Sequence, residues 1–81
     1  MDWIDVNDSL PKKGWDKRCS DQVLVLAQSN RGYYNHYIAY YDYQAEDWWL
    51  RDKGEYAYTC DFIVRWWVGF PKLPFAAASL D

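Results

Sequence analysis

The sequence predicts a small, mainly β domain: an antiparallel meander of three to four strands that can curl into an open barrel, with at most one short helix. Short runs of β-branched and aromatic residues alternate with turn-forming residues, which is typical of strands joined by hairpins. No stretch keeps apolar residues at the helical spacing i, i+3, i+4 and i+7 without a turn signal interrupting it. The 81 residues suffice for a single core, and the 21% of aromatic residues supply much of its apolar area.

Residues 1–22 are expected to form an extended arm followed by a loop. Isolated apolar residues are mixed there with Asp, Asn, Ser, Pro and Gly, which favour turns. Asp8 or Ser9 can cap a short helical turn, but Pro11 and Gly14 would end it almost at once. Any helix here is therefore brief.

Residues 23–70 carry the predicted β meander. The apolar run at residues 23–27 is too short for a helix and gives the clearest strand. The turn residues that follow it, ending at Gly32, predict a hairpin. Four strands are expected, at residues 23–27, 34–41, 48–51 and within 56–70.

The last of these strands contains a pair of adjacent tryptophans. Strict alternation puts Phe62, Val64, Trp66 and Val68 on one face and Ile63, Arg65 and Trp67 on the other. After this strand, Pro71 and Pro74 cannot donate backbone hydrogen bonds. Residues 71–81 are therefore expected to be a tail.

Charge and cysteine content limit the possible partners and the cellular compartment. The formal net charge of −3 is opposite to the basic surface that phosphate binding needs, so generic nucleic-acid binding is not expected. No apolar stretch approaches the roughly 20 residues of a membrane-spanning helix, and the acidic N-terminus does not resemble a secretory signal. We expect a cytoplasmic protein without a membrane partner, in which Cys19 and Cys60 remain thiols.

The sequence contains no recognisable catalytic or metal-binding motif. His36 is the single imidazole, and no Gly-x-Ser-x-Gly elbow accompanies it. Cys19 and Cys60 lack the close spacing of zinc ligands. Carboxylates such as Asp47 and Asp52 are common in turns, and the glycines are too dispersed to cradle a phosphate. We therefore expect a protein that is not an enzyme and that has no cofactor or metal.

The excess of aromatic residues suggests a binding surface. Neighbours on a strand point to opposite faces, so the pairs Trp48-Trp49 and Trp66-Trp67 cannot all lie in one core. Exposed Trp and Tyr side chains suit a protein partner, a sugar ring or stacked bases. The other interpretation is that a small chain uses every ring for stability.

Three blocks in register resemble a family of small bacterial and phage proteins known as domain of unknown function 551. The first block comprises Trp3, Ile4, Val6, Leu10 and Pro11. The second comprises Val23, Leu24 and Val25, then Ala39, Tyr40, Tyr41 and Asp42, and then Trp48 or Trp49. The third spans residues 64–71, where Trp66 replaces a family histidine and Gly69 a family proline. The resemblance implies a compact domain in a phage or prophage setting, and no site.

Together these observations predict a phage- or prophage-type accessory protein that acts as a non-catalytic interaction module. Its expected partner is a host or phage protein, or a second copy of itself, bound through Tyr41, Trp49 and Trp66. The alternative is a domain that binds a small ligand or carbohydrate, in which the aromatics stack on a ring and Asp42 or Asp47 holds hydroxyl groups.

Overall fold

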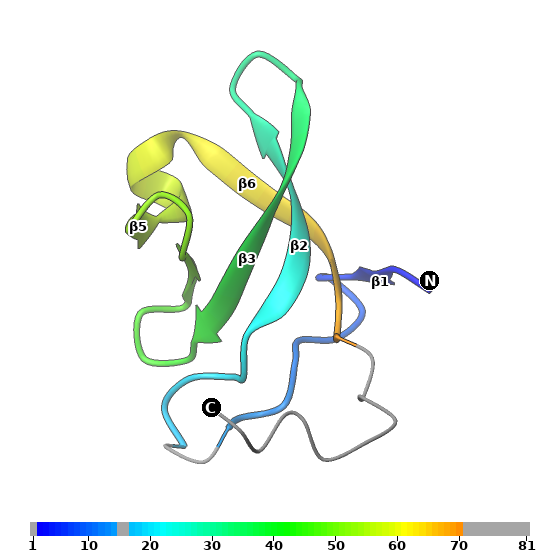
Figure 1. Cartoon of the computed structure of the whole chain (residues 1–81), viewed down its shortest axis with the longest axis vertical. Helices are drawn as coiled ribbons and strands as arrows, with labels where there is room; N and C mark the ends of the chain where they lie inside the picture. The colour runs from blue at the N-terminus through cyan, green and yellow to red at the C-terminus, as the bar shows by residue number, and fades with distance from the viewer. Residues whose placement is uncertain (1, 15–16, 71–81) are drawn as a thin grey trace, which may run out of the picture.

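The computed structural model describes residues 2–14 and 17–70 of the chain and confirms a mainly β fold (Figure 1). The four expected strands are present as β2 (Val23–Ser29), β3 (Tyr34–Asp42), β4 (Asp47–Leu50) and β6 (Phe62–Val68). Two strands of two residues each, β1 (Ile4–Asp5) and β5 (Glu55–Tyr56), are added to them. Two residues are too few to display an alternating pattern, so the sequence gives no sign of these strands.

The only helical element of the described residues is a 3₁₀ turn, η1 (Ala57–Cys60). It lies directly before β6 and not in the N-terminal arm, where a brief helical turn was the alternative to a loop. Around Asp8 the chain forms a turn instead, in which the backbone N–H groups of Asp8 and Ser9 both donate to the carbonyl of Asp5. The expected tail, residues 71–81, lies outside the described residues.

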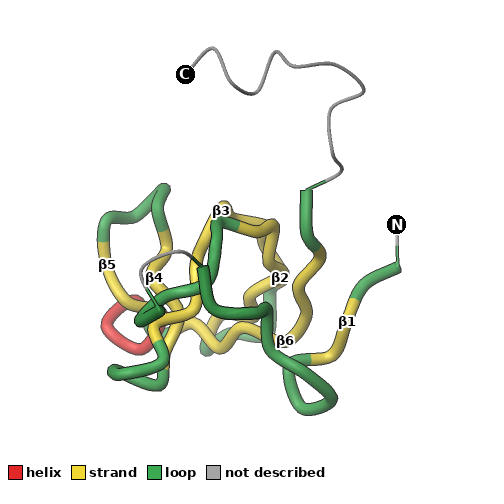
Figure 2. The backbone as a smooth tube through the Cα atoms, turned by 90° about the horizontal axis from the view of Figure 1, so that it is seen from below, coloured by secondary structure: helices red, strands yellow, loops and turns green. Residues whose placement is uncertain are grey.

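All six strands form one antiparallel sheet in the order β1-β6-β2-β3-β4-β5. Strands β2 to β5 follow one another as a meander. Strand β6 departs from the meander, because η1 returns the chain to the far side of β2. The sheet remains open, and its edge strands β1 and β5 lie on opposite sides of the molecule (Figure 2).

A β-bulge in β6 reverses the face assignment expected for its C-terminal half. Leu26 of β2 is opposite Trp66, but the next residue, Ala27, is opposite Val64, so Arg65 is an extra residue. An extra residue inverts the alternation that follows it. Trp67 therefore shares a face with Val64, and Trp66 lies on the opposite face, which corrects the expectation from strict alternation.

The core lies on one face of the sheet, which we call the inner face. Its buried side chains include Val25 and Leu50, both fully buried, and the buried residue Ala57 of η1 packs with them. Val6 and Leu10 from the N-terminal arm pack against the same cluster. The buried members are Val23, Val25, Ala27, Ala39, Trp48, Leu50, Ala57 and Val64. Burial of these apolar side chains is the main source of stability available to so small a chain.

Candidate functional site

The opposite face of the sheet, the outer face, is also apolar at its centre. Strand β2 begins with five apolar residues in succession, so alternation cannot send polar side chains outward there. Val23, Val25 and Ala27 point into the core, and Leu24 and Leu26 point outward and are half-buried. A continuous apolar run of this kind is typical of strands that are covered on both faces.

Strand register shows which side chains share the outer face with Leu24 and Leu26. Leu24 is opposite Val68 and Ile38, and Leu26 is opposite Trp66. Farther along the sheet, Trp49 is opposite both Tyr40 and Tyr56. We call this set the outer band: Leu24, Leu26, Ile38, Tyr40, Trp49, Tyr56, Trp66 and Val68.

Aromatic contacts hold one end of the outer band in place. The Trp49 ring stacks on Tyr40, with centroids 6.4 Å apart, and meets Tyr56 edge-on at 5.0 Å. Tyr56 stacks in turn on Tyr58, with centroids 6.1 Å apart. Such contacts reduce the freedom of the rings, so this end of the band is held in one arrangement.

Every member of the outer band keeps some contact with solvent. Its members are half-buried, except for Trp66, which is 37% exposed at the other end of the band. Ile63, on the same face, is 56% exposed. The contrast with the fully buried Val25 and Leu50 indicates that the apolar side chains of this surface are not closed off from solvent. A polar contact lies in the same part of the sheet, where Arg51, whose backbone N–H donates to the carbonyl of Ile38, donates with its side chain to Oε1 of Gln22 at 3.1 Å.

Asp42 anchors the part of the sheet that carries Tyr56. The Tyr56 hydroxyl donates to Oδ2 of Asp42 at 2.7 Å, and Arg18 donates to both carboxylate oxygens at 3.2 and 3.1 Å. The backbone N–H groups of Gln44 and Ala45 also donate to this carboxylate. The hydrogen bonds from Arg18 are the main reason that the pKa of Asp42 lies well below its usual range, and they outweigh the burial, which alone would raise that pKa.

The structure brings two of the three predicted anchors onto one face. Trp49 and Trp66 lie at opposite ends of the outer band. Tyr41 lies on the inner face, edge-on to Trp48 at 5.2 Å and to Tyr43 at 4.9 Å, and burial raises the pKa of its phenol. Tyr41 therefore cannot share one surface with Trp49 and Trp66, and its role as an anchor stays a prediction.

The two carboxylates considered for sugar hydroxyls are both engaged within the protein. Asp42 is only 2% exposed and uses both oxygens for internal hydrogen bonds. Asp47 accepts the backbone N–H of Tyr58 with its Oδ2 at 3.2 Å. The sequence suggested Asp42 only as a residue that could hold hydroxyl groups, because its partners Arg18 and Tyr56 are distant in the chain.

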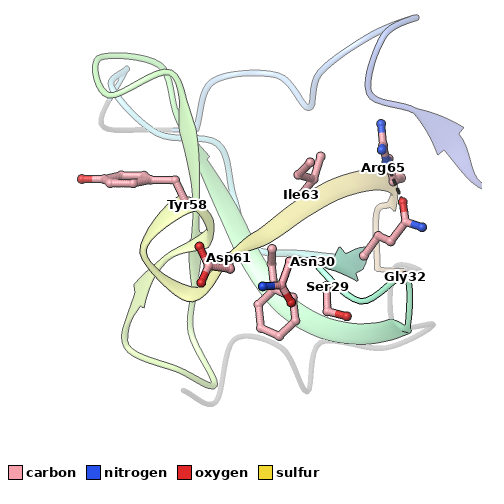
Figure 3. A pocket seen from close by; sticks show the side chains of 9 residues that line it. Ser29, Asn30, Gly32, Tyr58, Asp61, Ile63 and Arg65 are labelled. Carbon is pink, nitrogen blue, oxygen red and sulfur yellow. Dashed lines mark hydrogen bonds between the residues drawn. The ribbon is translucent and has the colours of Figure 1, made fainter.

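A groove of about 550 Å³ lies between the β2–β3 turn and the start of β6 (Figure 3). Asn30 and Gly32 line it from the turn, and Asp61 and Arg65 line it from the other side. Arg65 donates to Oε1 of Gln28 at 3.1 Å across the two strands. In Figure 3 the Tyr58 side chain points away from the other labelled residues. The groove could not be found from the sequence, because it depends on β6 pairing with β2.

The remaining reactive side chains do not form a cluster. Cys60 donates to Oε2 of Glu55 at 3.0 Å, which raises the pKa of its thiol, and no disulfide joins it to Cys19 within the described residues. Across residues 2–14 and 17–70, His, Cys, Asp and Glu side chains do not gather in any group that could hold a metal ion. In the same part of the chain, no helix has the length and apolar character needed to cross a membrane.

Comparison with known proteins adds no relative. No protein-family model matches the chain, and neither a curated protein nor a solved structure is similar enough to count as a match.

Proposed function

We propose that this protein is a non-catalytic interaction module that binds another protein through the outer band. The observation that carries this proposal is the outward position of Leu24 and Leu26 on the central strand β2, where both remain only half-buried. A partner that covers them would remove apolar area from water at the middle of the sheet. The tryptophans Trp49 and Trp66, one at each end of the band, are the proposed anchors.

The chemistry of the band favours a protein over a nucleic acid. Aliphatic side chains occupy its centre and aromatic rings its ends, as in the apolar core of a protein interface. A nucleic-acid surface would need a basic groove along the sheet, whereas the chain has a formal net charge of −3. A phage or prophage setting, with a host or phage protein as partner in the cytoplasm, rests on the family resemblance and belongs to the same proposal.

Replacing Trp66 with alanine is expected to weaken partner binding by about 2 kcal/mol, or roughly 30-fold in Kd. Tyr33→Ala is the matched control, because Tyr33 is an exposed aromatic residue of the β2–β3 turn and lies outside the band. Tagged wild-type and variant proteins are used as baits in nuclease-treated lysate of the source cells, and the affinity of the captured protein is then measured.

The expected result is one stoichiometric protein that is retained by the wild type and by Tyr33→Ala and lost with Trp66→Ala. Capture that survives Trp66→Ala and Trp49→Ala equally well would show that the partner uses another surface. A captured second copy of the chain would redirect the proposal to self-association.

A small-ligand or carbohydrate site is the second candidate, and the groove beside the β2–β3 turn favours it. The amide of Asn30, the carboxylate of Asp61 and the guanidinium of Arg65 line this groove together with apolar side chains. A few polar groups on an apolar wall suit a polar ligand such as a sugar.

A titration with a panel of glycans and nucleotides, followed by backbone amide NMR signals, tests this second candidate. Binding in the groove is expected to shift the signals of Asn30, Gly32 and Asp61 and to leave that of Leu50 unchanged. Unchanged spectra across the panel would remove it.

A further inference from the structure

Part of strand β3 forms an open edge of the sheet. Strand β3 has nine residues, but β4 pairs only with residues 39–42. The preceding half belongs to the β2–β3 hairpin, which projects beyond the neighbouring strands in Figure 1. In that half, Tyr34, Asn35 and His36 are exposed.

Hydrogen bonds at Ile38 show which backbone groups face this edge. The N–H of Ile38 donates to Oδ2 of Asp52 at 3.2 Å, and its carbonyl accepts the N–H of Arg51 at 2.9 Å, so both groups point away from β2. Residues two apart on a strand direct their backbone groups to the same side. The N–H and C=O groups of His36 and Tyr34 therefore face outward as well.

The backbone groups of the odd-numbered residues of β3 face β2, which agrees with this assignment. The carbonyl of Tyr33 accepts the N–H of Ser29 on β2 at 2.8 Å, so the odd-numbered residues use the β2 side. Within the described residues, no strand pairs with β3 on the outward side of Tyr34 and His36. Two N–H donors and two C=O acceptors thus remain available to a further strand.

At Tyr34 and His36 the open edge also lacks the usual protection against strand pairing, whereas Lys53 lies beside the next residues, with its Nζ 5.9 Å from the centroid of the Tyr37 ring. Exposed edges are commonly shortened or carry lysine, proline or a bulge. The edge strands β1 and β5 are only two residues long. By contrast, residues 34–37 contain no lysine, arginine or proline, and their pairing with β2 is regular.

We propose that an extended segment of a partner protein adds to β3 as a further strand, paired with the backbone of Tyr34 and His36. The unused donors and acceptors select an extended polypeptide, because only a strand presents matching groups at this spacing. On the outer face of the sheet, the side chains of the added segment would lie beside His36, which is next to Leu26. Alternate residues of the segment would also lie beside Tyr34, which is 51% exposed, so we expect them to be apolar and to extend the outer band. This inference rests on the proposed function only in taking a protein as the partner.

His36→Pro tests this proposal at one backbone group. Proline removes the outward N–H and leaves the hydrogen bonds with β2 in place, because residue 36 does not use that side; proline is tolerated at such edge positions. His36→Thr keeps the N–H and is the matched control. The probes are 12-residue peptides selected from a random display library against the wild-type protein.

We expect the selected peptides to carry apolar residues at alternate positions. Their affinity for His36→Pro should be about tenfold or more lower than for the wild type, and their affinity for His36→Thr should differ from it by no more than about twofold. N-methylation of the peptide amides that face β3 is expected to abolish binding, and N-methylation of the intervening amides to preserve it. This second arm decides the question even if His36→Pro does not fold.

Three results would overturn the inference. One is the absence of any enriched peptide. Another is that the affinity of the peptides falls with Trp66→Ala but not with His36→Pro. The outer band would then be a binding surface without strand addition. The third is a dimer of the protein that is lost with His36→Pro, which would make a second copy the occupant of the edge.

Discussion

Replacing Asp42 with asparagine is expected to lower the free energy of unfolding by about 3 kcal/mol. The carboxylate accepts hydrogen bonds from Arg18, from the Tyr56 hydroxyl and from two backbone N–H groups, and an amide cannot accept all of them. Urea denaturation followed by circular dichroism measures the loss. Asp8→Asn, at an exposed position, is the matched control and is expected to change stability by less than about 0.5 kcal/mol.

The effect of Asp42→Asn should depend on pH in a defined direction. The pKa of Asp42 is lowered in the folded protein, so its stabilising contribution is present above the unfolded pKa of about 3.9 and is lost as the pH falls toward the folded pKa. The stability difference between wild type and variant should therefore be smaller at pH 3 than at pH 7, by about 1 kcal/mol. A difference that does not change between these pH values would contradict the role given to the ionised carboxylate.

Alanine at Trp48 and alanine at Trp49 should have different consequences although the two residues are neighbours. Trp48 is 5% exposed in the core, so Trp48→Ala is expected to cost about 3–5 kcal/mol of stability. Trp49 lies in the outer band and is only half-buried, and we expect its removal to cost about 1–2 kcal/mol. Chemical denaturation of both variants under identical conditions provides the comparison.

The loss of partner binding should be larger for Trp49→Ala than for Trp48→Ala, the reverse of the order expected for stability. Among molecules that remain folded, Trp49→Ala is expected to weaken capture of the partner, whereas Trp48→Ala leaves the outer band itself intact. Equal losses of stability in the two variants would show that both faces of the sheet are closed, and the proposed binding surface would then have no basis.

Much of the sheet was predictable because its four longer strands are bounded by clear turn residues. The apolar run at residues 23–27 and the turn ending at Gly32 were sufficient to predict the hairpin of β2 and β3. The same run carried the information that both faces of the sheet are apolar at this strand. The place of β6 beside β2 was not predictable, because no local pattern specifies which free edge a strand joins after the chain crosses the sheet.

The division of the adjacent tryptophans between two faces was predictable, but which residue takes which face was not always so. In β6 the bulge at Arg65 inverts the alternation of side chains between the two faces, and this places Trp66 in the outer band. The bulge contains no glycine that would indicate it in the sequence. The assignment of Tyr41 to the inner face likewise depends on register. The carboxylate network of Asp42 joins three distant segments, so no motif in the sequence could reveal it.

The open edge of β3 has a similar origin. It exists because β4 is four residues long and β3 is nine, and because the Asp52 carboxylate binds Ile38 where the pairing ends. Element lengths are among the least certain features of a sequence-based prediction. A site defined by a difference in strand length could therefore be recognised only in the structure.

The exposure of methyl groups to a soluble paramagnetic agent tests the central claim, that the outer band is an uncovered binding surface, most directly. In the protein alone, NMR signals from the methyl groups of Leu24 and Leu26 should broaden, and those of Val25 and Leu50 should remain sharp. When the captured partner is added, the Leu24 and Leu26 signals should become protected. Leu24 and Leu26 signals as sharp as that of Val25 in the protein alone, or still fully broadened in the complex, would contradict the account.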